Sequence, residues 1–473
     1  MRVRPPIATD LAIGSEPVSA TRFAVRPVAG GALAVGAVVG AAYTLSPLTM
    51  LFFLAAALAV SWATRGLTGS ERRWVARALA LAIALRVTAV AVLLLLTNPE
   101  GGQYNAFFPD ARFVLDRSLW MVNLRHGVTI GPWYLSRTFE HYGDPTYSYA
   151  LSLLQEFVGP SPYALNFLSV GAFIAGSIIL HKLVRVSFGA VAALGGFVLL
   201  LFWPTSFAWS VSLLKESLQL ALTAIALAGA VAGLRANTWR RRAGGIVAAA
   251  AALAIDASLR SAAAIILCLS IGVNLALLLV RTSRVAGVLM LGTIAVCVLT
   301  PQVRRTAVER TTAEVRGAAS RHLGNVVMPG YSYRPLDDRF YAEGQYSPAT
   351  MVAGEGARFL IRAAVDVLVV PTPWQIWSRS ALLFLPQQLV WYVLVVLAVP
   401  GILVGFQRDV MLTLLLATYI ATGIAMIGPN NGNIGTLVRH RDMVVPFVGW
   451  LGALGSCWTL SRISASPSWS ASS

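Results

Sequence analysis

A short charged stretch contains the residues best suited to chemistry. Asp110 and Asp116 stand six residues apart, and Arg112 and Arg117 follow them within two positions. A nearby guanidinium keeps a carboxylate ionised, and an ionised carboxylate can accept the proton of an attacking hydroxyl. Asp110 is therefore predicted to act as a general base, the alternative being that it caps the following helix. Arg112 and Asp116 are assigned to substrate binding, although a solvated helix face also explains Asp116.

Further charges stand where long apolar runs begin. Lys215 and Glu216 open one such run, and Arg260 precedes another. Charged side chains at a bilayer need partners or water, and they often mark functional sites. Their simpler interpretations are an interfacial ion pair for Lys215 with Glu216 and an i to i+4 salt bridge of Arg260 with Asp256. Lys215, Glu216 and Arg260 are nonetheless candidates for a substrate cleft.

Two arginines late in the chain are candidates for binding an anion. Arg439 and Arg441 flank His440 just before an apolar run, and a turn rich in glycine and asparagine, residues 428–436, precedes them. Paired guanidiniums bind phosphate through several N–H donors, and a glycine-rich turn can add backbone donors. Arg439 and Arg441 are therefore predicted to hold a phosphate or pyrophosphate, against the alternative of simple surface solvation.

No pattern in the sequence predicts a cofactor. The three cysteines fall within apolar runs, and the five histidines show no spacing typical of metal ligands. The sequence also has no phosphate-binding loop and no dinucleotide fingerprint, so chemistry that uses ATP or NAD is not expected. No metal ligands are assigned, and whether a divalent ion takes part is left open.

Composition shows what kind of protein must position these residues. Of 473 residues, 57% are hydrophobic and 12% are charged, with a mean hydropathy of +0.69. Repeated long apolar runs predict an all-α, polytopic integral membrane protein, and the short alternating strands of a membrane β-barrel are not seen. The net charge of +17 is better explained by basic loops facing a lipid bilayer than by nucleic acid, which is not expected as a partner.

The apolar runs predict about 12 transmembrane helices, with amphipathic or re-entrant helices on the outer face. The expected segments are a cytoplasmic tail (1–27), three membrane helices (28–97), a first large extracytoplasmic loop with surface helices (98–158), six membrane helices (159–300), a second large extracytoplasmic loop (301–379), three membrane helices (380–461) and a cytoplasmic tail (462–473).

Basic residues between the second and third spans set the predicted orientation. Arg65, Arg72, Arg73 and Arg77 place that connection in the cytoplasm by the positive-inside rule. The charged candidates at the other ends of the spans then face the extracytoplasmic side of a cell membrane. The second large loop carries many arginines on that outer side, and an anionic ligand there is one reason for them.

Several motifs together resemble those of the GT-C superfamily, integral-membrane glycosyltransferases related to protein mannosyltransferases and aminoarabinose transferases. The motifs are Pro109-Asp110-Ala111 in the first outer loop, Gly159-Pro160-Ser161-Pro162, Phe188-Gly189, Pro204-Thr205-Ser206, Leu214-Lys215-Glu216-Ser217 and Leu259-Arg260-Ser261-Ala262. The resemblance covers roughly residues 98–280, and the stretch from Gly435 to Arg441 is similar to a late outer turn of some relatives.

The resemblance implies transfer of a sugar from a polyprenyl-phosphate donor to a cell-envelope glycan or glycolipid acceptor, with inversion at the anomeric carbon. By position, Asp110 would deprotonate the acceptor hydroxyl. The residues that would hold the donor phosphate or line the cleft are Arg260, Arg439, Arg441, Lys215 and Glu216. The chain departs from the family in having two spans, where relatives usually have one, before the span that leads into the Asp110 loop. It also shows no large soluble C-terminal domain, which assigns acceptor recognition to loop 301–379.

Two other functions compete with this one. An O-antigen or exopolysaccharide polymerase or ligase, acting on polyprenyl-diphosphate glycans, would use the arginine-rich second loop, with Arg316, Arg321 and His322 as its candidates. Asp110 would then have no catalytic role. A lipid or oligosaccharide flippase would need no chemistry, but transporters commonly show repeated halves, and no repeat is seen.

Overall fold

The protein is helical throughout the part that the structure describes. The computed structural model describes residues 25–40, 46–97, 108–140, 145–326, 331–342, 347–375 and 379–465. Within these ranges no strand forms, and one isolated antiparallel bridge joins Ser332 to Asn433. The predicted all-α class is therefore confirmed. Most of both predicted tails lies outside the described residues.

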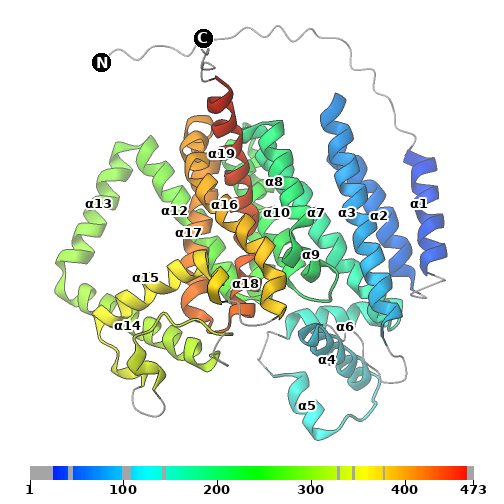
Figure 1. Ribbon diagram of the computed structural model, residues 1–473, viewed down its shortest axis with the longest axis horizontal. Helices are drawn as coiled ribbons and strands as arrows, with labels where there is room; N and C mark the ends of the chain where they lie inside the picture. Colours follow the sequence, from blue (N-terminus) through cyan, green and yellow to red (C-terminus); the bar gives the residue numbers. More distant parts are fainter. Residues whose placement is uncertain are drawn as a thin grey trace, which may run out of the picture.

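The first half of the described chain contains ten helices, of which α4, α5 and α6 lie at the surface (Figure 1). They are α1 (Val25–Val39), α2 (Pro47–Thr64), α3 (Gly69–Leu95), α4 (Pro109–Arg125), α5 (Pro132–Thr138), α6 (Thr146–Val158), α7 (Pro162–Phe188), α8 (Ala190–Phe202), α9 (Pro204–Ser210) and α10 (Glu216–Arg235). Proline stands at the first position of many of them, where its missing N–H costs nothing.

The helices of the second half complete the bundle and its second outer region. They are α11 (Trp239–Leu259), α12 (Ser261–Thr282), α13 (Arg284–Leu299), α14 (Pro301–Gly324), η3 (Asp338–Tyr341), η4 (Pro348–Thr350), α15 (Ala353–Val369), η5 (Pro373–Gln375), α16 (Arg379–Arg408), α17 (Val410–Ile427), η6 (Gly428–Asn430), α18 (Ile434–Arg441) and α19 (Val445–Ala465).

By length and hydropathy, eight described helices can cross a membrane, or up to ten if each of two bent pairs counts as one span. This confirms a polytopic membrane protein and falls short of the predicted 12 spans. The two remaining predicted spans coincide with α1 and α13, which have 15 and 16 residues. A perpendicular crossing needs roughly 20 residues, so these two helices are short for it.

Several helices extend beyond the apolar runs that predicted them, at about 78–96, 163–180 and 245–255. α3 begins at Gly69 instead of Ala78, α7 ends at Phe188 instead of Leu180, and α11 begins at Trp239 instead of Gly245. In each case arginines that were expected in a loop continue the helix instead. Arginine is a good helix former, and its long side chain can reach the interface from a helical turn.

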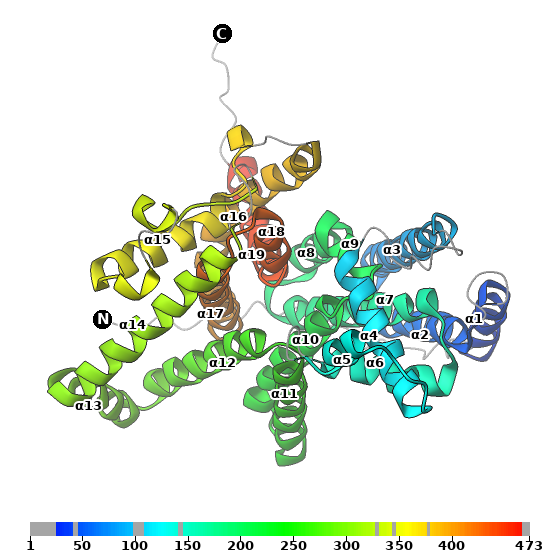
Figure 2. The same ribbon diagram turned by 90° about the horizontal axis from the view of Figure 1, so that it is seen from below.

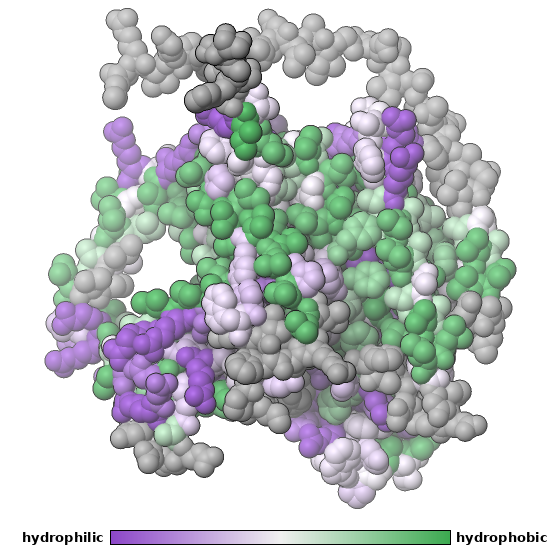
Figure 3. Space-filling view, viewed as in Figure 1, coloured by the Kyte–Doolittle hydropathy of each residue, from purple (hydrophilic) through white to green (hydrophobic). Residues whose placement is uncertain are grey.

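The surface helices gather at one end of the bundle, which we call the loop end. Figure 1 shows α4, α5 and α6 at the lower right and α14 and α15 at the lower left, while α3, α8 and α19 reach the upper end. Figure 2, viewed from below, separates these two outer groups on opposite sides of α18. Hydrophobic residues cover much of the middle of the bundle, and hydrophilic residues gather over α14 and α15 (Figure 3). An apolar belt with polar ends is typical of a membrane protein.

The two bent pairs break close to the loop end. α8 and α9 meet at 59°, and α18 and α19 meet at 62°. Pro204 ends the first helix of one pair, because proline cannot donate the backbone hydrogen bond that a continuous helix needs. The buried Arg86 of α3 then donates to the Leu201 carbonyl at 2.9 Å and to Ser210 Oγ at 2.8 Å. These bonds satisfy polar groups at the break and fix α9.

Close packing of α16 on α19 holds the second bent pair. A Cβ atom on Gly401 would lie 1.9 Å from the Leu451 carbonyl oxygen, and one on Gly455 would lie 1.9 Å from the Leu397 carbonyl oxygen. Only glycine fits at such a distance, and small residues of this kind let membrane helices approach closely. α18 therefore continues into α19, which packs closely on α16.

Candidate active site

α4 places Asp110 at the loop end. Pro109 is the first residue of the helix and Phe108 is its N-cap, so Asp110 lies in the first turn and is not the cap. The Phe108 ring meets the Trp209 ring of α9 edge to face at 6.1 Å. Asp110 Oδ2 accepts a hydrogen bond from Arg439 of α18, and its side chain is 69% exposed. The carboxylate is thus held by one partner while most of it remains open to an incoming group.

Glu216 connects two arginines from different helices. Its Oε1 atom accepts hydrogen bonds from Arg439 Nε at 2.8 Å and from Arg260 Nη2 at 3.1 Å, and it lies 2.7 Å from Arg439 Nη2. The three side chains are 10%, 17% and 18% exposed, respectively, for Glu216, Arg439 and Arg260. Arg260 makes no salt bridge with Asp256, contrary to the simpler interpretation of the sequence.

Lys215 completes the group by a bond to the backbone. Its ammonium Nζ donates to the Leu259 carbonyl at 2.7 Å, next to Arg260. We call Asp110, Lys215, Glu216, Arg260 and Arg439 the arginine cluster. It holds three cationic and two anionic side chains, so it carries a net positive charge of one. A net cationic group of this kind suits an anionic ligand.

The break between α18 and α19 is fixed to the break between α8 and α9. Asp442 Oδ1 accepts hydrogen bonds from Thr205 Oγ1 at 2.7 Å and from Trp203 Nε1 at 3.2 Å. The Arg439 guanidinium carbon lies 5.3 Å from the centroid of the Trp209 ring, within cation–π range. α9 therefore supports the same arginine that holds Asp110.

A pocket adjoins the arginine cluster on the side of the helical bundle. Its cavity volume is about 40 Å³, and the wider space around it, roughly 530 Å³ in all, includes open solvent. The side chains with polar atoms that line it are Ser206, Trp209, Glu216, Ser217, Gln219, Thr223, Tyr419, Arg439 and Asp442. A pocket next to convergent charges is the default place to expect a ligand.

Three residues assigned to substrate binding are not brought into the arginine cluster. Arg112 faces Asp116 at 3.6 Å within α4, and burial raises the pKa of Asp116. Arg441 is buried and donates to Gln388 Oε1 at 2.7 Å and to the Val370 carbonyl. Arg439 and Arg441 are two positions apart in one helix, and side chains at that spacing point to different sides. Arg439 pairs with Arg260 around Glu216 instead.

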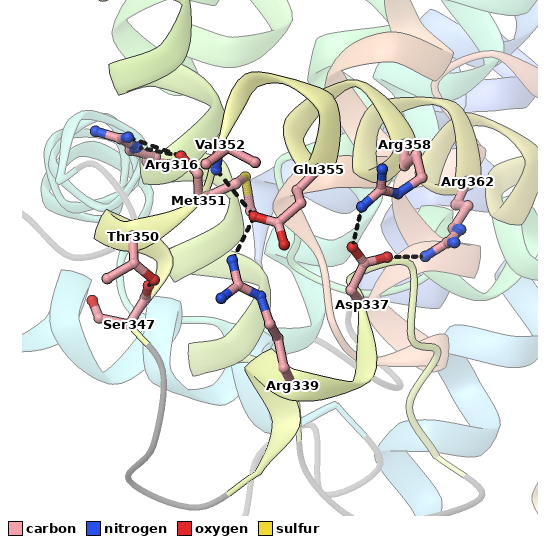
Figure 4. A network of polar contacts seen from close by, with 10 residues as sticks. All are labelled: Arg316, Asp337, Arg339, Ser347, Thr350, Met351, Val352, Glu355, Arg358 and Arg362. Atoms are coloured by element: carbon pink, nitrogen blue, oxygen red, sulfur yellow. Dashed lines mark hydrogen bonds and ion pairs between the residues drawn. The ribbon is translucent and has the colours of Figure 1, made fainter.

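The arginine-rich second loop forms a small folded unit with its own apolar core. Asp337 accepts hydrogen bonds from Arg358 at 2.6 Å and Arg362 at 2.7 Å, and Glu355 accepts one from Arg339 at 2.6 Å (Figure 4). We call these five residues the loop network. The hydrogen bond from Arg358, aided by Arg362, lowers the pKa of Asp337 below its usual value.

The three residues proposed for a polymerase or ligase take part in structural bonds. Arg316 donates twice to the Met351 carbonyl, at 2.8 and 3.2 Å, and Arg321 Nε donates to Asn430 at 2.7 Å. His322 is fully buried between Asn431 and Tyr341, and burial lowers its pKa. Each side chain joins α14 to a neighbouring segment.

The pocket contains residues that the sequence interpretation did not select. Gln219 and Thr223 follow Glu216 at i+3 and i+7, so the three lie on one face of the otherwise apolar α10. That polar stripe was a usable signal. Asp442 follows Arg441 in the charged run that the sequence points to, but no role was assigned to it. Trp209 gave no signal, because its role depends on two helix breaks that meet only in three dimensions.

Among the described residues no group of three or more His, Cys, Asp or Glu side chains lies together as potential metal ligands. Comparison with protein-family models, with curated proteins and with solved structures gives no match to this chain. No family is therefore assigned, and the function has to be inferred from the arrangement of the side chains at the site.

Proposed function

We propose that the protein is a membrane glycosyltransferase that moves a sugar from a polyprenyl-phosphate donor to a glycan or glycolipid acceptor at the extracytoplasmic surface. The observation that carries the proposal is the contact of Arg439 with both Asp110 and Glu216, next to a pocket. One guanidinium thereby links a largely exposed carboxylate to a buried, net cationic cluster. This is the pairing that a base and an anionic leaving group require.

The two arginines suit a phosphodiester. Arg260 and Arg439 both donate to Glu216 Oε1, so their guanidinium groups converge on one point. A donor phosphate at that point would take over N–H donors that now serve the two carboxylates. Lys215 and Glu216 would orient the arginines and keep the site close to neutral once the anion binds. Charge-assisted hydrogen bonds of this kind are roughly twice as strong as neutral ones.

The proposed reaction is a single displacement. Asp110 accepts the proton of the acceptor hydroxyl as that oxygen forms a bond to the anomeric carbon. The bond from the anomeric carbon to the phosphate oxygen breaks, and its electron pair leaves with polyprenyl phosphate. Attack opposite the leaving group inverts the anomeric configuration. Arg260 and Arg439 stabilise the charge that develops on the departing phosphate.

The orientation is supported by the distribution of arginine. Arg72, Arg73 and Arg77 stand in the first turns of α3, at its end opposite the loop end (Figure 1). Arg240 and Arg242 stand in the first turn of α11, whose other end leads to Arg260 in the arginine cluster. The positive-inside rule then puts the arginine cluster on the extracytoplasmic side of a cell membrane. The loop end also meets the headgroup region, where a lipid-linked donor presents its phosphate.

A test is transfer of radiolabelled sugar from a panel of polyprenyl-phosphate hexoses, using membranes that supply the acceptor. Asp110→Asn should lower the transfer rate about 100- to 10,000-fold, the usual contribution of a general base. Asp116→Asn, on the same helix, is the matched control and should change the rate less than about threefold. Wild-type transfer by Asp110→Asn would exclude Asp110 as the base.

A further inference from the structure

We infer that the pocket beside the arginine cluster binds the sugar ring of the donor and selects a neutral, hydroxyl-rich sugar over an acidic one. The inference rests on the proposed function, since it assigns the pocket to the sugar of the same donor. It adds the chemical class of that sugar and the residues that recognise it.

The first observation is a set of buried polar atoms in the pocket wall that lack hydrogen-bond partners within the described structure. They are Glu216 Oε2, Asp442 Oδ2, Trp209 Nε1 and both side-chain atoms Oε1 and Nε2 of Gln219. Gln219 is 4% exposed. It lies beside Asp256 of α11 and the two form no hydrogen bond of good geometry. Buried polar groups without partners are costly, so their concentration at one cavity points to a polar ligand.

The second observation is the balance of donors and acceptors. Glu216 Oε2, Asp442 Oδ2 and Gln219 Oε1 accept hydrogen bonds, whereas Gln219 Nε2 and Trp209 Nε1 donate them. A sugar hydroxyl can serve both kinds of partner, because it donates one hydrogen bond and accepts others.

The third observation concerns charge and shape. Two carboxylates, Glu216 and Asp442, line the pocket, and only Arg439 among the lining residues is cationic. That arginine is already engaged by Asp110 and Glu216. A uronic acid would bring another carboxylate next to Glu216, which like-charge repulsion disfavours. The rings of Trp209 and Tyr419 offer flat apolar surfaces to the ring of a neutral sugar.

The position of the pocket fits a donor held at both ends. Arg439 lines the pocket and also donates to Asp110, which is not part of the lining. A phosphate at Arg439 and a sugar ring against Gln219 and Thr223 would therefore leave the anomeric carbon near Arg439.

The test measures binding of three lipids to the purified protein in nanodiscs. The probes are bare polyprenyl phosphate, its neutral hexosyl derivatives with glucose, mannose or galactose, and the matching hexuronosyl derivatives. At least one hexosyl lipid should bind about tenfold or more tightly than both the bare lipid and its uronic acid counterpart. Gln219→Leu should reduce that hexosyl advantage about tenfold, the loss of one or two buried hydrogen bonds.

Using the ratio of hexosyl to bare lipid corrects for any loss of folded protein. Thr223→Val should reduce the ratio less than Gln219→Leu does. Asn274→Leu is the matched control, since Asn274 is a buried amide on α12 that bonds Met411 and lies outside the pocket lining. It should leave the ratio unchanged.

The two proposals fail differently. Equal binding of hexosyl and hexuronosyl lipids, or a hexosyl advantage that survives Gln219→Leu, would overturn the assignment of the pocket while bare lipid still binds through Arg439. Failure of bare polyprenyl phosphate to bind, or binding that is unaffected by Arg439→Ala, would overturn the proposed function and this inference with it.

Discussion

The arginine cluster and the loop network are both built from arginines and carboxylates at the same end of the molecule, but they differ in what remains unsatisfied. In the loop network each Asp337 oxygen accepts a guanidinium N–H, and Glu355 also bonds the Val352 backbone. In the arginine cluster Glu216 keeps one buried oxygen without a partner in the described structure, and Asp110 is mostly open.

The pairing of the carboxylates distinguishes the loop network, which has a structural role, from the arginine cluster, which is a candidate site. Exposed salt bridges that are fully paired add little stability and leave nothing for a ligand to bind. Buried charges that converge beside a cavity with unpartnered polar atoms are costly without a further function. The number of arginines in the second loop is therefore a poorer guide to function than the hydrogen bonding and burial of the arginines beside the pocket.

Among the arginine substitutions, the largest expected effect is that of Arg439→Ala. It removes the hydrogen bonds to Asp110 and Glu216 and the proposed contact with the donor phosphate. Transfer and binding of bare polyprenyl phosphate should both fall about 100-fold or more. Arg358→Ala in the loop network is the matched control and should leave both within about twofold. Equal losses in the two variants would remove the distinction between the regions.

A smaller effect is expected from Arg260→Ala. Arg260 contributes a single hydrogen bond to Glu216, at 3.1 Å, and Arg439 remains in place. Affinity for bare polyprenyl phosphate should fall about tenfold, and Arg260→Lys should recover part of it because the charge is retained. Unchanged affinity in Arg260→Ala would leave Arg439 alone as the anion site.

The sequence predicted much of this contrast and missed the rest for physical reasons. The apolar runs predicted the all-α membrane class but not the number of spans that the structure supports. The charges at the ends of those runs predicted Asp110, Lys215, Glu216, Arg260 and Arg439, which the structure brings together. Arg441 was grouped with Arg439 because they are neighbours in sequence, yet helical geometry turns it toward Gln388. Asp442 and Trp209 depend on two helix breaks that pack together, and such a contact leaves no periodic pattern in the sequence.

The loop network should affect stability instead of transfer. Asp337→Asn should lower the free energy of unfolding at pH 7 by about 1 kcal/mol, with transfer unchanged. Because the pKa of Asp337 is lowered in the folded state, its stabilisation is present above the unfolded pKa of roughly 4 and is lost as pH falls through the folded pKa. Chemical unfolding in detergent should therefore show a difference between wild type and Asp337→Asn at pH 7 that disappears on strong acidification. A difference that grows in acid would contradict this account.

The smallest effect is expected from Arg321→Ala, which also tests the polymerase or ligase alternative. Arg321 is exposed and donates to Asn430, so its loss should change stability by no more than about 0.5 kcal/mol. Transfer should stay within about twofold of the wild-type rate. A loss of transfer as large as that of Arg439→Ala would move the active site to the second loop.

The most direct measurement is the position of the donor phosphate in an experimental structure of the protein with a polyprenyl-phosphate hexose. The account predicts a phosphate within hydrogen-bond distance of Arg439 and Arg260, with the contact between Arg439 and Asp110 opened and the sugar ring against Gln219. A phosphate bound at Arg316, Arg321 or the loop network, with the arginine cluster unchanged, would contradict it.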